Sequence, residues 1–135
     1  MKRFLPVLLA LLALAVAAPA AADAPTEFTF RDVFGDVNPC TGGPMMVTLV
    51  ATGFVHEHGS REVVHGERTI TTSDGFAGRG TESFVDNGRI VRFRFADIMR
   101  NASGDRFRAR GVFVLDLSTD TVRVDRFQLT CLGPA

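Results

Sequence analysis

Apolar and polar residues alternate along most of the chain after residue 25, and short turn signals interrupt this alternation at close spacing. Alternation with a period of two is typical of β-strands with one buried face, because successive side chains point to opposite faces. Glycine, proline, asparagine and aspartate gather where the alternation stops, as expected for turns. The pattern predicts strands but no helix after the first 22 residues, with the strands at residues 26–34, 45–58, 61–72, 78–85, 89–99, 105–117 and 121–132.

The segments between these strands are mostly short, which predicts an antiparallel meander. Gly59-Ser60 is the expected turn of one hairpin, and Asp86-Asn87-Gly88 is a strong turn signal because Asn-Gly tolerates positive φ. The glycines at 75, 78 and 80 are expected to mark a bulge or a sharp bend. They are not expected to form a nucleotide-binding loop, since no helix follows them.

Cys40 and Cys131 are the only cysteines, and they lie just after the first predicted strand and at the end of the last one. We expect them to form a disulfide, which requires their Cα atoms to come within about 7 Å. The two edges of the meander would then meet. We therefore expect a small all-β meander closed into a barrel of seven or eight strands, with a two-sheet β-sandwich as the alternative.

Residues 1–22 have the pattern of a signal peptide. Lys2 and Arg3 precede an apolar run from Leu5 to Ala18, and small residues up to Ala22 provide a cleavage site. The apolar run is short for a membrane span, which needs about 20 residues. We expect residues 23–135 to form a single domain without a membrane span, located outside the cell or in the cell envelope.

Composition and motifs exclude several function classes. Lys2 is the only lysine, and removing Lys2 and Arg3 changes the formal net charge from 0 to about −2. That balance gives no reason to expect a nucleic-acid partner. The chain has no nucleophile-elbow motif, no zinc-protease motif and no phosphate loop, and its carboxylates are scattered. We predict no catalytic residue and no cofactor.

Three histidines lie in one predicted hairpin, at His56, His58 and His65. If Gly59-Ser60 is a two-residue turn, all three imidazoles point to the same face of the hairpin. Imidazole nitrogens bind zinc and copper well, so the three histidines are a candidate metal site. The alternative is a set of solvent-facing histidines, because the opposite face of the same strand carries the apolar residues.

Arginines alternate along the last three predicted strands, at Arg92, Arg94, Arg106, Arg108, Arg110, Arg123 and Arg126. One interpretation is an anion-binding patch. The favoured interpretation is a solvated face, on which the arginines pair across strands with nearby aspartates. The candidate aspartates are Asp97, Asp116, Asp120 and Asp125.

The segment Asn38-Pro39-Cys40-Thr41-Gly42 resembles a motif of small secreted proteins, common in actinobacteria, that carry Asn-Pro-Cys-Thr-Gly soon after the signal peptide. The chain departs from that pattern at Gly43, where glutamate is usual. The resemblance implies an exported β domain with a Cys–Cys bridge, and it implies no activity. Asn38, Pro39, Thr41 and Gly42 are a candidate interaction loop, although a loop that directs Cys40 to its partner explains them equally.

Three functions fit these features. The first is a non-enzymatic, lipocalin-like barrel that binds a small apolar ligand or a cell-envelope component. The second is a cyclase or isomerase of the allene-oxide-cyclase or dirigent type, which would need a buried carboxylate or histidine with a perturbed pKa in its pocket. The third is an interaction module that uses the 38–44 loop and has no cavity. Phenylalanines are expected to line or fill the interior, at Phe28, Phe30, Phe54, Phe93, Phe95, Phe107, Phe113 and Phe127.

Overall fold

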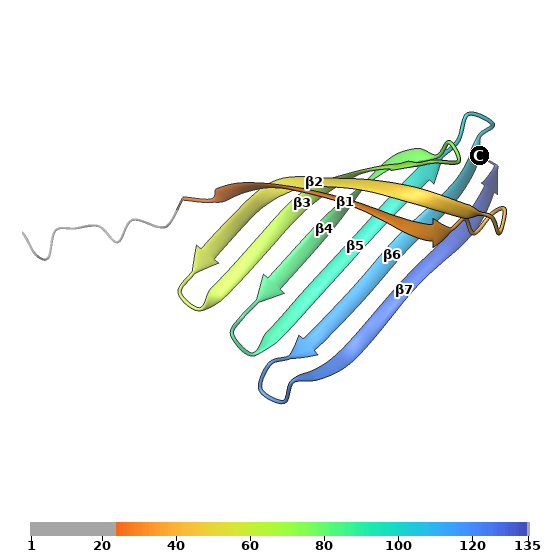
Figure 1. The fold of residues 1–135 in the computed structure, drawn as a ribbon. Coiled ribbons are helices and arrows are strands. Elements are labelled where there is room, and N and C mark those ends of the chain that lie inside the picture. The colour runs from red at the N-terminus through yellow and green to blue at the C-terminus, as the bar shows by residue number, and fades with distance from the viewer. Residues whose placement is uncertain (1–23, 135) are drawn as a thin grey trace, which may run out of the picture.

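Seven antiparallel strands form one sheet in the computed structural model, which describes residues 24–134 (Figure 1). Each strand pairs with its neighbours in the chain, so the predicted all-β meander is confirmed. The predicted signal peptide, residues 1–22, lies outside the described residues. No helix in residues 24–134 is long and apolar enough to span a membrane. The strands are β1 (Thr26–Val37), β2 (Pro44–His58), β3 (Arg61–Thr72), β4 (Ala77–Asp86), β5 (Ile90–Arg100), β6 (Asp105–Asp116) and β7 (Thr121–Pro134).

Both predicted hairpin turns are confirmed. His58 pairs with Arg61 across Gly59-Ser60, as the two-residue turn requires. At the second turn, Asn87 Oδ1 accepts hydrogen bonds from the backbone N–H groups of Arg89 (3.0 Å) and Ile90 (2.7 Å). Gly88 has a φ of 82°, a conformation that costs glycine little because it has no Cβ. Turn chemistry therefore sets the register of these hairpins.

The expected bulge at the central glycines is wrong. β4 pairs regularly with both β3 and β5, and the register shifts lie between β6 and β7 instead. A Cβ at Gly78 would overlap the carbonyl oxygen of Ile98 on β5, and one at Gly80 would overlap that of Ala96. These glycines thus permit close backbone approach, which is the other common reason for glycine inside a strand.

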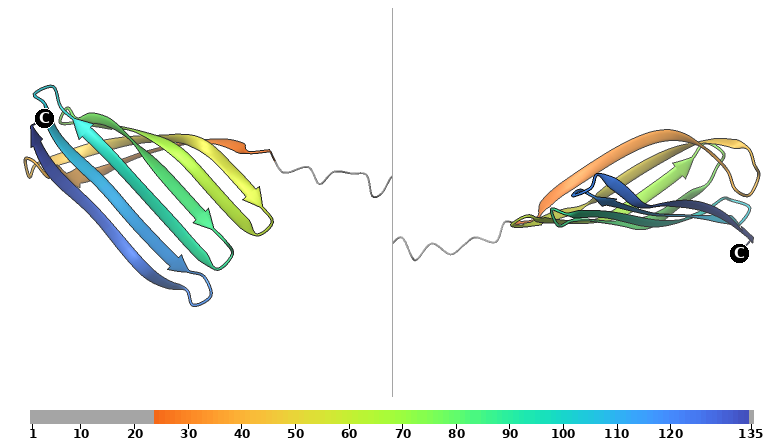
Figure 2. Two further views of the ribbon diagram at one scale, coloured as in Figure 1. Left: turned by 180° about the vertical axis from the view of Figure 1, so that it is seen from behind. Right: turned by 90° about the horizontal axis from the view of Figure 1, so that it is seen from below.

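The expected closure into a barrel is also wrong. β1 and β7 are the two ends of the strand order, and within residues 24–134 they do not pair with each other. The sheet curls so that its β1–β3 side arches over its β5–β7 side (Figure 2). The alternative of a two-sheet sandwich is likewise wrong, because all strands belong to one hydrogen-bonded sheet.

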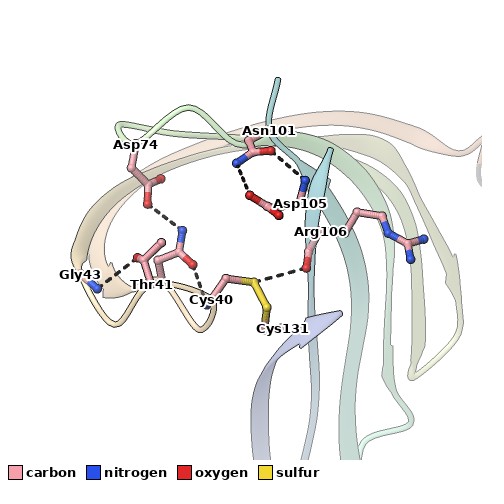
Figure 3. Close-up of a disulfide and its surroundings, with 9 residues drawn as sticks. Cys40, Thr41, Gly43, Asp74, Asn101, Asp105, Arg106 and Cys131 are labelled. Carbon is pink, nitrogen blue, oxygen red and sulfur yellow. Dashed lines mark hydrogen bonds between the residues drawn. A yellow bond between two sulfur atoms is a disulfide. The ribbon is translucent and has the colours of Figure 1, made fainter. Parts of the chain in front are cut away.

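The predicted disulfide is present and joins the two edges at one end only. Cys40 and Cys131 are bonded, with their Cα atoms 4.9 Å apart (Figure 3). From that end β1 and β7 diverge (Figure 1). A disulfide brings two points together, whereas closure needs a continuous ladder of backbone hydrogen bonds. The bond therefore ties the curled sheet without sealing it.

The core lies on the inner, concave face near the disulfide. Phe76, in the turn after β3, packs against Phe107 with 4.9 Å between ring centroids. Cys40, Phe95 and Leu129 pack against the core from its margin. The buried apolar residues of this cluster are Met45, Val47, Leu49, Ile70, Phe76, Met99, Phe107 and Ala109.

Candidate ligand-binding cleft

A cavity of about 390 Å³ opens on the inner face, between the two free edges of the sheet. Phe30 and Phe34 line it from β1, while Phe127 and Leu129 line it from β7. Phe30 is 53% exposed and Phe127 is 56% exposed, although both point inward. The interior is therefore not completely filled by side chains. The remaining apolar lining includes Val47, Leu49, Ile70, Phe93, Phe95, Met99, Phe107 and Ala109.

Phe54 does not belong to this lining, contrary to expectation. It pairs with His65 and is half exposed on the outer face, because Gly53 takes the inward position beside it.

Four charged side chains also line the cavity, at Asp36, Arg68, Glu82 and Asp97. Arg68 connects the last two. Arg68 Nε donates to both carboxylate oxygens of Asp97, at 3.0 and 3.2 Å. Arg68 Nη1 donates to Glu82 Oε2 at 2.8 Å. The guanidinium also lies over the ring of Phe95, with Cζ 4.5 Å from the ring centroid. Such a cation–π contact favours the planar guanidinium in this position.

The register of three strands explains how this cluster forms. Arg68 on β3 faces Gly80 on β4, and Gly80 faces Asp97 on β5. Because Gly80 has no side chain, Arg68 extends over β4 to reach Asp97. In the next inward row, Glu82 and Phe95 lie side by side between Gly66 and Gly111. A Cβ at Gly111 would overlap the Phe95 ring.

Asp97 was predicted as a partner for the outer arginines, and this prediction is wrong. Asp97 is only 2% exposed, and it faces inward because it has the same parity along β5 as Phe93 and Phe95. Burial raises the pKa of Asp97, an effect that Arg68 opposes and the charge of Glu82 reinforces. The parity of Asp97 was readable from the sequence, whereas the reach of Arg68 over Gly80 required the register of two strand pairs.

One carboxylate oxygen of the cluster is free to bind a ligand. Among the described residues, Glu82 Oε1 accepts no hydrogen bond, and Glu82 lines the cavity. Two carboxylates and one guanidinium have a net charge of −1 when all are ionised. The cleft thus combines apolar walls with one cluster that offers hydrogen-bond acceptors and has a net negative charge.

No protein-family model, curated protein or solved structure matches the chain. The likeness to small secreted proteins with the Asn-Pro-Cys-Thr-Gly motif stays a prediction.

The loop that contains this motif has a clear structural role (Figure 3). Asn38 is fully buried, and its Oδ1 accepts from the N–H of Cys40 at 2.8 Å. Its Nδ2 donates to Asp74 at 2.7 Å, and its backbone N–H donates to the Gly43 carbonyl at 2.8 Å. Cys40 is thereby held 3.4 Å, at Sγ, from the carbonyl oxygen of Arg106.

The remaining residues of the loop are not part of the cleft. Pro39, Thr41 and Gly42 do not line the cavity. Thr41 Oγ1 instead accepts from the N–H of Gly43 at 3.2 Å. The interaction-module interpretation expected a protein without a cavity, and the structure has one.

The three histidines lie on the outer face of the β2–β3 hairpin in the predicted register. His56 pairs with Val63, and His65 pairs with Phe54. Within residues 24–134, no group of three or more His, Cys, Asp or Glu side chains is placed to hold a metal ion. The structure therefore adds no support for a metal site at His56, His58 and His65.

The predicted ion pairs on the arginine face are largely missing. Asp116 accepts a charged hydrogen bond from Arg123, which is the one predicted type of pair that is present. Among the described residues, the other salt bridges are those of Arg68. Within residues 24–134, no carboxylate lies within salt-bridge distance of the other predicted arginines, which are Arg92, Arg94, Arg106, Arg108, Arg110 and Arg126.

Proposed function

We propose that this protein is a non-enzymatic binding protein for a small, mostly apolar molecule that carries a hydroxyl or amino group. The observation that carries the proposal is an apolar cavity of about 390 Å³ with one buried charged cluster in its wall. Binding sites for small molecules have this composition, with volumes of about 300–1,000 Å³. The likeness to lipocalins is limited to a curled antiparallel sheet with a cavity on its inner face.

The charged cluster determines which polar group the ligand would carry. Glu82 Oε1 would accept a hydrogen bond from a ligand hydroxyl or amine. A ligand carboxylate would approach a cluster with net negative charge, so it would bind poorly. Walls formed by Phe30, Phe34 and Phe127 would cover the apolar part of the ligand.

The disulfide supports the proposed location outside the cytoplasm. Disulfides persist in oxidising compartments and are rare in the cytosol. Cys40 and Cys131 are both used in the bond, and no cysteine in the described chain is free. Together with the predicted signal peptide, this supports export to the cell envelope or the surrounding medium.

The test combines ligand recovery with a matched pair of variants. Native mass spectrometry of the protein purified from its own host's medium should show a bound molecule that denaturation releases. The neutral fluorescent probe N-phenyl-1-naphthylamine should also bind the ligand-free protein. Phe127→Ala should weaken probe binding several-fold, while Phe54→Ala, a similarly exposed phenylalanine on the outer face, should not. Equal effects of the two variants, or no probe binding at all, would contradict the proposal.

A second candidate is acid–base catalysis in the same cavity, of the cyclase or isomerase type. The raised pKa of the buried Asp97 favours it, because shifted carboxyl groups are common in active sites. Both oxygens of Asp97 already accept from Arg68, however, which makes binding the better-supported function. Conversion of the recovered ligand by the wild type, lost in Asp97→Asn while binding persists, would favour the enzyme.

A further inference from the structure

The outer face of the sheet carries a second hollow, and Glu82 and Phe95 line both this hollow and the cleft. Its volume is about 680 Å³, and three exposed arginines line it from adjacent strands, at Arg94, Arg110 and Arg126. Arg94 and Arg126 flank Val112 on either side, and Arg110 lies two residues before Val112 on the same face. His65, Thr81, Ser83 and Gln128 add hydrogen-bonding groups to the wall.

The positive charge continues from this hollow along β6. Arg106, Arg108 and Arg110 occupy alternate positions, so they share the outer face and repeat at about 6.8 Å. Arg100 on β5 faces Arg106 directly. Like charges placed opposite each other destabilise a sheet. The row therefore has an electrostatic cost that an external anion would relieve.

Unsatisfied hydrogen-bond donors lie in the same row. The Nε atoms of Arg106 and Arg108 are buried and have no hydrogen-bond partner in the described chain. The hydroxyl of Thr130, which pairs with Arg108 across β6 and β7, is also buried without a partner. A buried donor without a partner destabilises the folded protein. The guanidinium groups of this row are therefore not fully paired within the described chain.

The combination selects a particular class of partner. A linear polymer with a negative group in every repeat matches a row of guanidinium groups at regular spacing, and clustered arginines favour phosphate. A flat bilayer would contact only part of this face, because the sheet is curled with its outer side convex (Figure 2). Single-stranded nucleic acid needs aromatic stacking platforms. Phe95, the aromatic residue at the described hollow, has its ring stacked on Arg68 inside.

We propose that the outer face of β5–β7 binds a linear polymer of phosphate groups through Arg94, Arg110 and Arg126 in the hollow and Arg106 and Arg108 along β6. The mature chain has a net charge of about −2, so this attraction is local and does not come from the charge of the whole protein. None of these five arginines lines the cleft, and neither proposal depends on the other.

The test uses inorganic polyphosphate as the probe and titration calorimetry at several salt concentrations. The wild type should bind, and log K should fall steeply with log salt. The variant Arg94→Gln/Arg110→Gln/Arg126→Gln should bind at least about tenfold more weakly, with a salt slope smaller by about 2–3. The control Arg31→Gln/Arg61→Gln/Arg89→Gln removes the same charge from exposed positions elsewhere and should bind within about twofold of the wild type.

Other probes and a wild-type measurement keep the proposal falsifiable. Polyglutamate should bind at least about tenfold more weakly than polyphosphate. Amide NMR shifts of the wild type should move on β5–β7 when polyphosphate is added, which does not depend on how the variants fold. Equal loss in both triple variants, shifts confined to other strands, or tighter binding to anionic vesicles or single-stranded oligonucleotides would overturn the proposal.

Discussion

Arg68 contacts Asp97 across the strand that separates them, and the missing side chain of Gly80 leaves the necessary space. The Nε–Oδ1 distance is 3.0 Å, although Arg68 belongs to β3 and Asp97 to β5. A central strand normally presents a side chain at this position. The charged part of the cleft therefore depends on a residue that has no functional group.

Gly80→Ala should destabilise the protein and disturb the cleft. The new Cβ would overlap Asp97 Oδ1 and the carbonyl oxygen of Ala96, and backbone atoms cannot move away cheaply. We expect a loss of about 1–3 kcal/mol in the free energy of unfolding, measured in urea. Gly35→Ala is the control, because its nearest neighbour would be Met46 Sδ at 3.8 Å, an ordinary contact. Equal stability of the two variants would show that Gly80 is not needed for close packing.

Arg68→Met should lower the free energy of unfolding more than removal of the whole charged cluster does. It leaves Asp97 and Glu82 close together without their cation, and breaking a buried pair costs about 3–5 kcal/mol. Asp97 titrates with a raised pKa in the folded state, and without Arg68 this pKa should rise further. The stability of Arg68→Met should therefore increase as the pH falls through the folded pKa of Asp97 towards 3.8, the unfolded value.

The comparison for this prediction is Arg68→Met combined with Asp97→Leu and Glu82→Leu. This apolar triple variant should recover much of the lost stability, because no buried charge is left unpaired. Unfolding curves at several pH values provide both measurements. If the stability of Arg68→Met did not change with pH, the unpaired charge of Asp97 would not be the cause of its instability.

The protein should lose stability in acid as Asp74 becomes protonated. Burial opposes ionisation of Asp74, but hydrogen bonds from Thr72 and Asn38 outweigh it, so its pKa lies below 3.8. Its contribution to stability is therefore present above pH 3.8 and disappears as the pH falls through the folded pKa. Asp74→Ala also leaves the buried Asn38 amide without its acceptor, which costs about 1–3 kcal/mol. The wild type and Asp74→Ala should differ most near pH 7 and converge in acid; a constant difference would contradict this mechanism.

Reduction of the disulfide should lower the unfolding free energy by about 4–5 kcal/mol in the loop-entropy model. The bond spans 91 residues, so it restricts most of the unfolded chain. Thermal unfolding with and without dithiothreitol measures the effect. The variant Cys40→Ser/Cys131→Ser should match the reduced wild type and should not respond to dithiothreitol. A reduced protein with unchanged thermal stability would exclude this role for the bond.

The outer arginines show where sequence reasoning was limited. Alternation placed Arg94, Arg108 and Arg110 on the face opposite the core, as observed. Their expected aspartate partners depended on which face each carboxylate occupied, and Asp97 had the parity of the core. Parity can be read locally. That Arg123 and Asp116 form the one salt bridge of this face among the described residues could be found only from the positions of the strands.

The sequence by itself determined the all-β class, the seven strands, the Gly59-Ser60 and Asn87-Gly88 turns and the pairing of Cys40 with Cys131. These features follow from alternation, turn conformations and the presence of only two cysteines, all of which act locally or by elimination. Only the tertiary structure decided that the sheet stays open and that Arg68 meets Asp97 over Gly80. Edge closure depends on the accumulated curl of seven strands, and the buried cluster depends on two registers at once, so neither is encoded in any single segment.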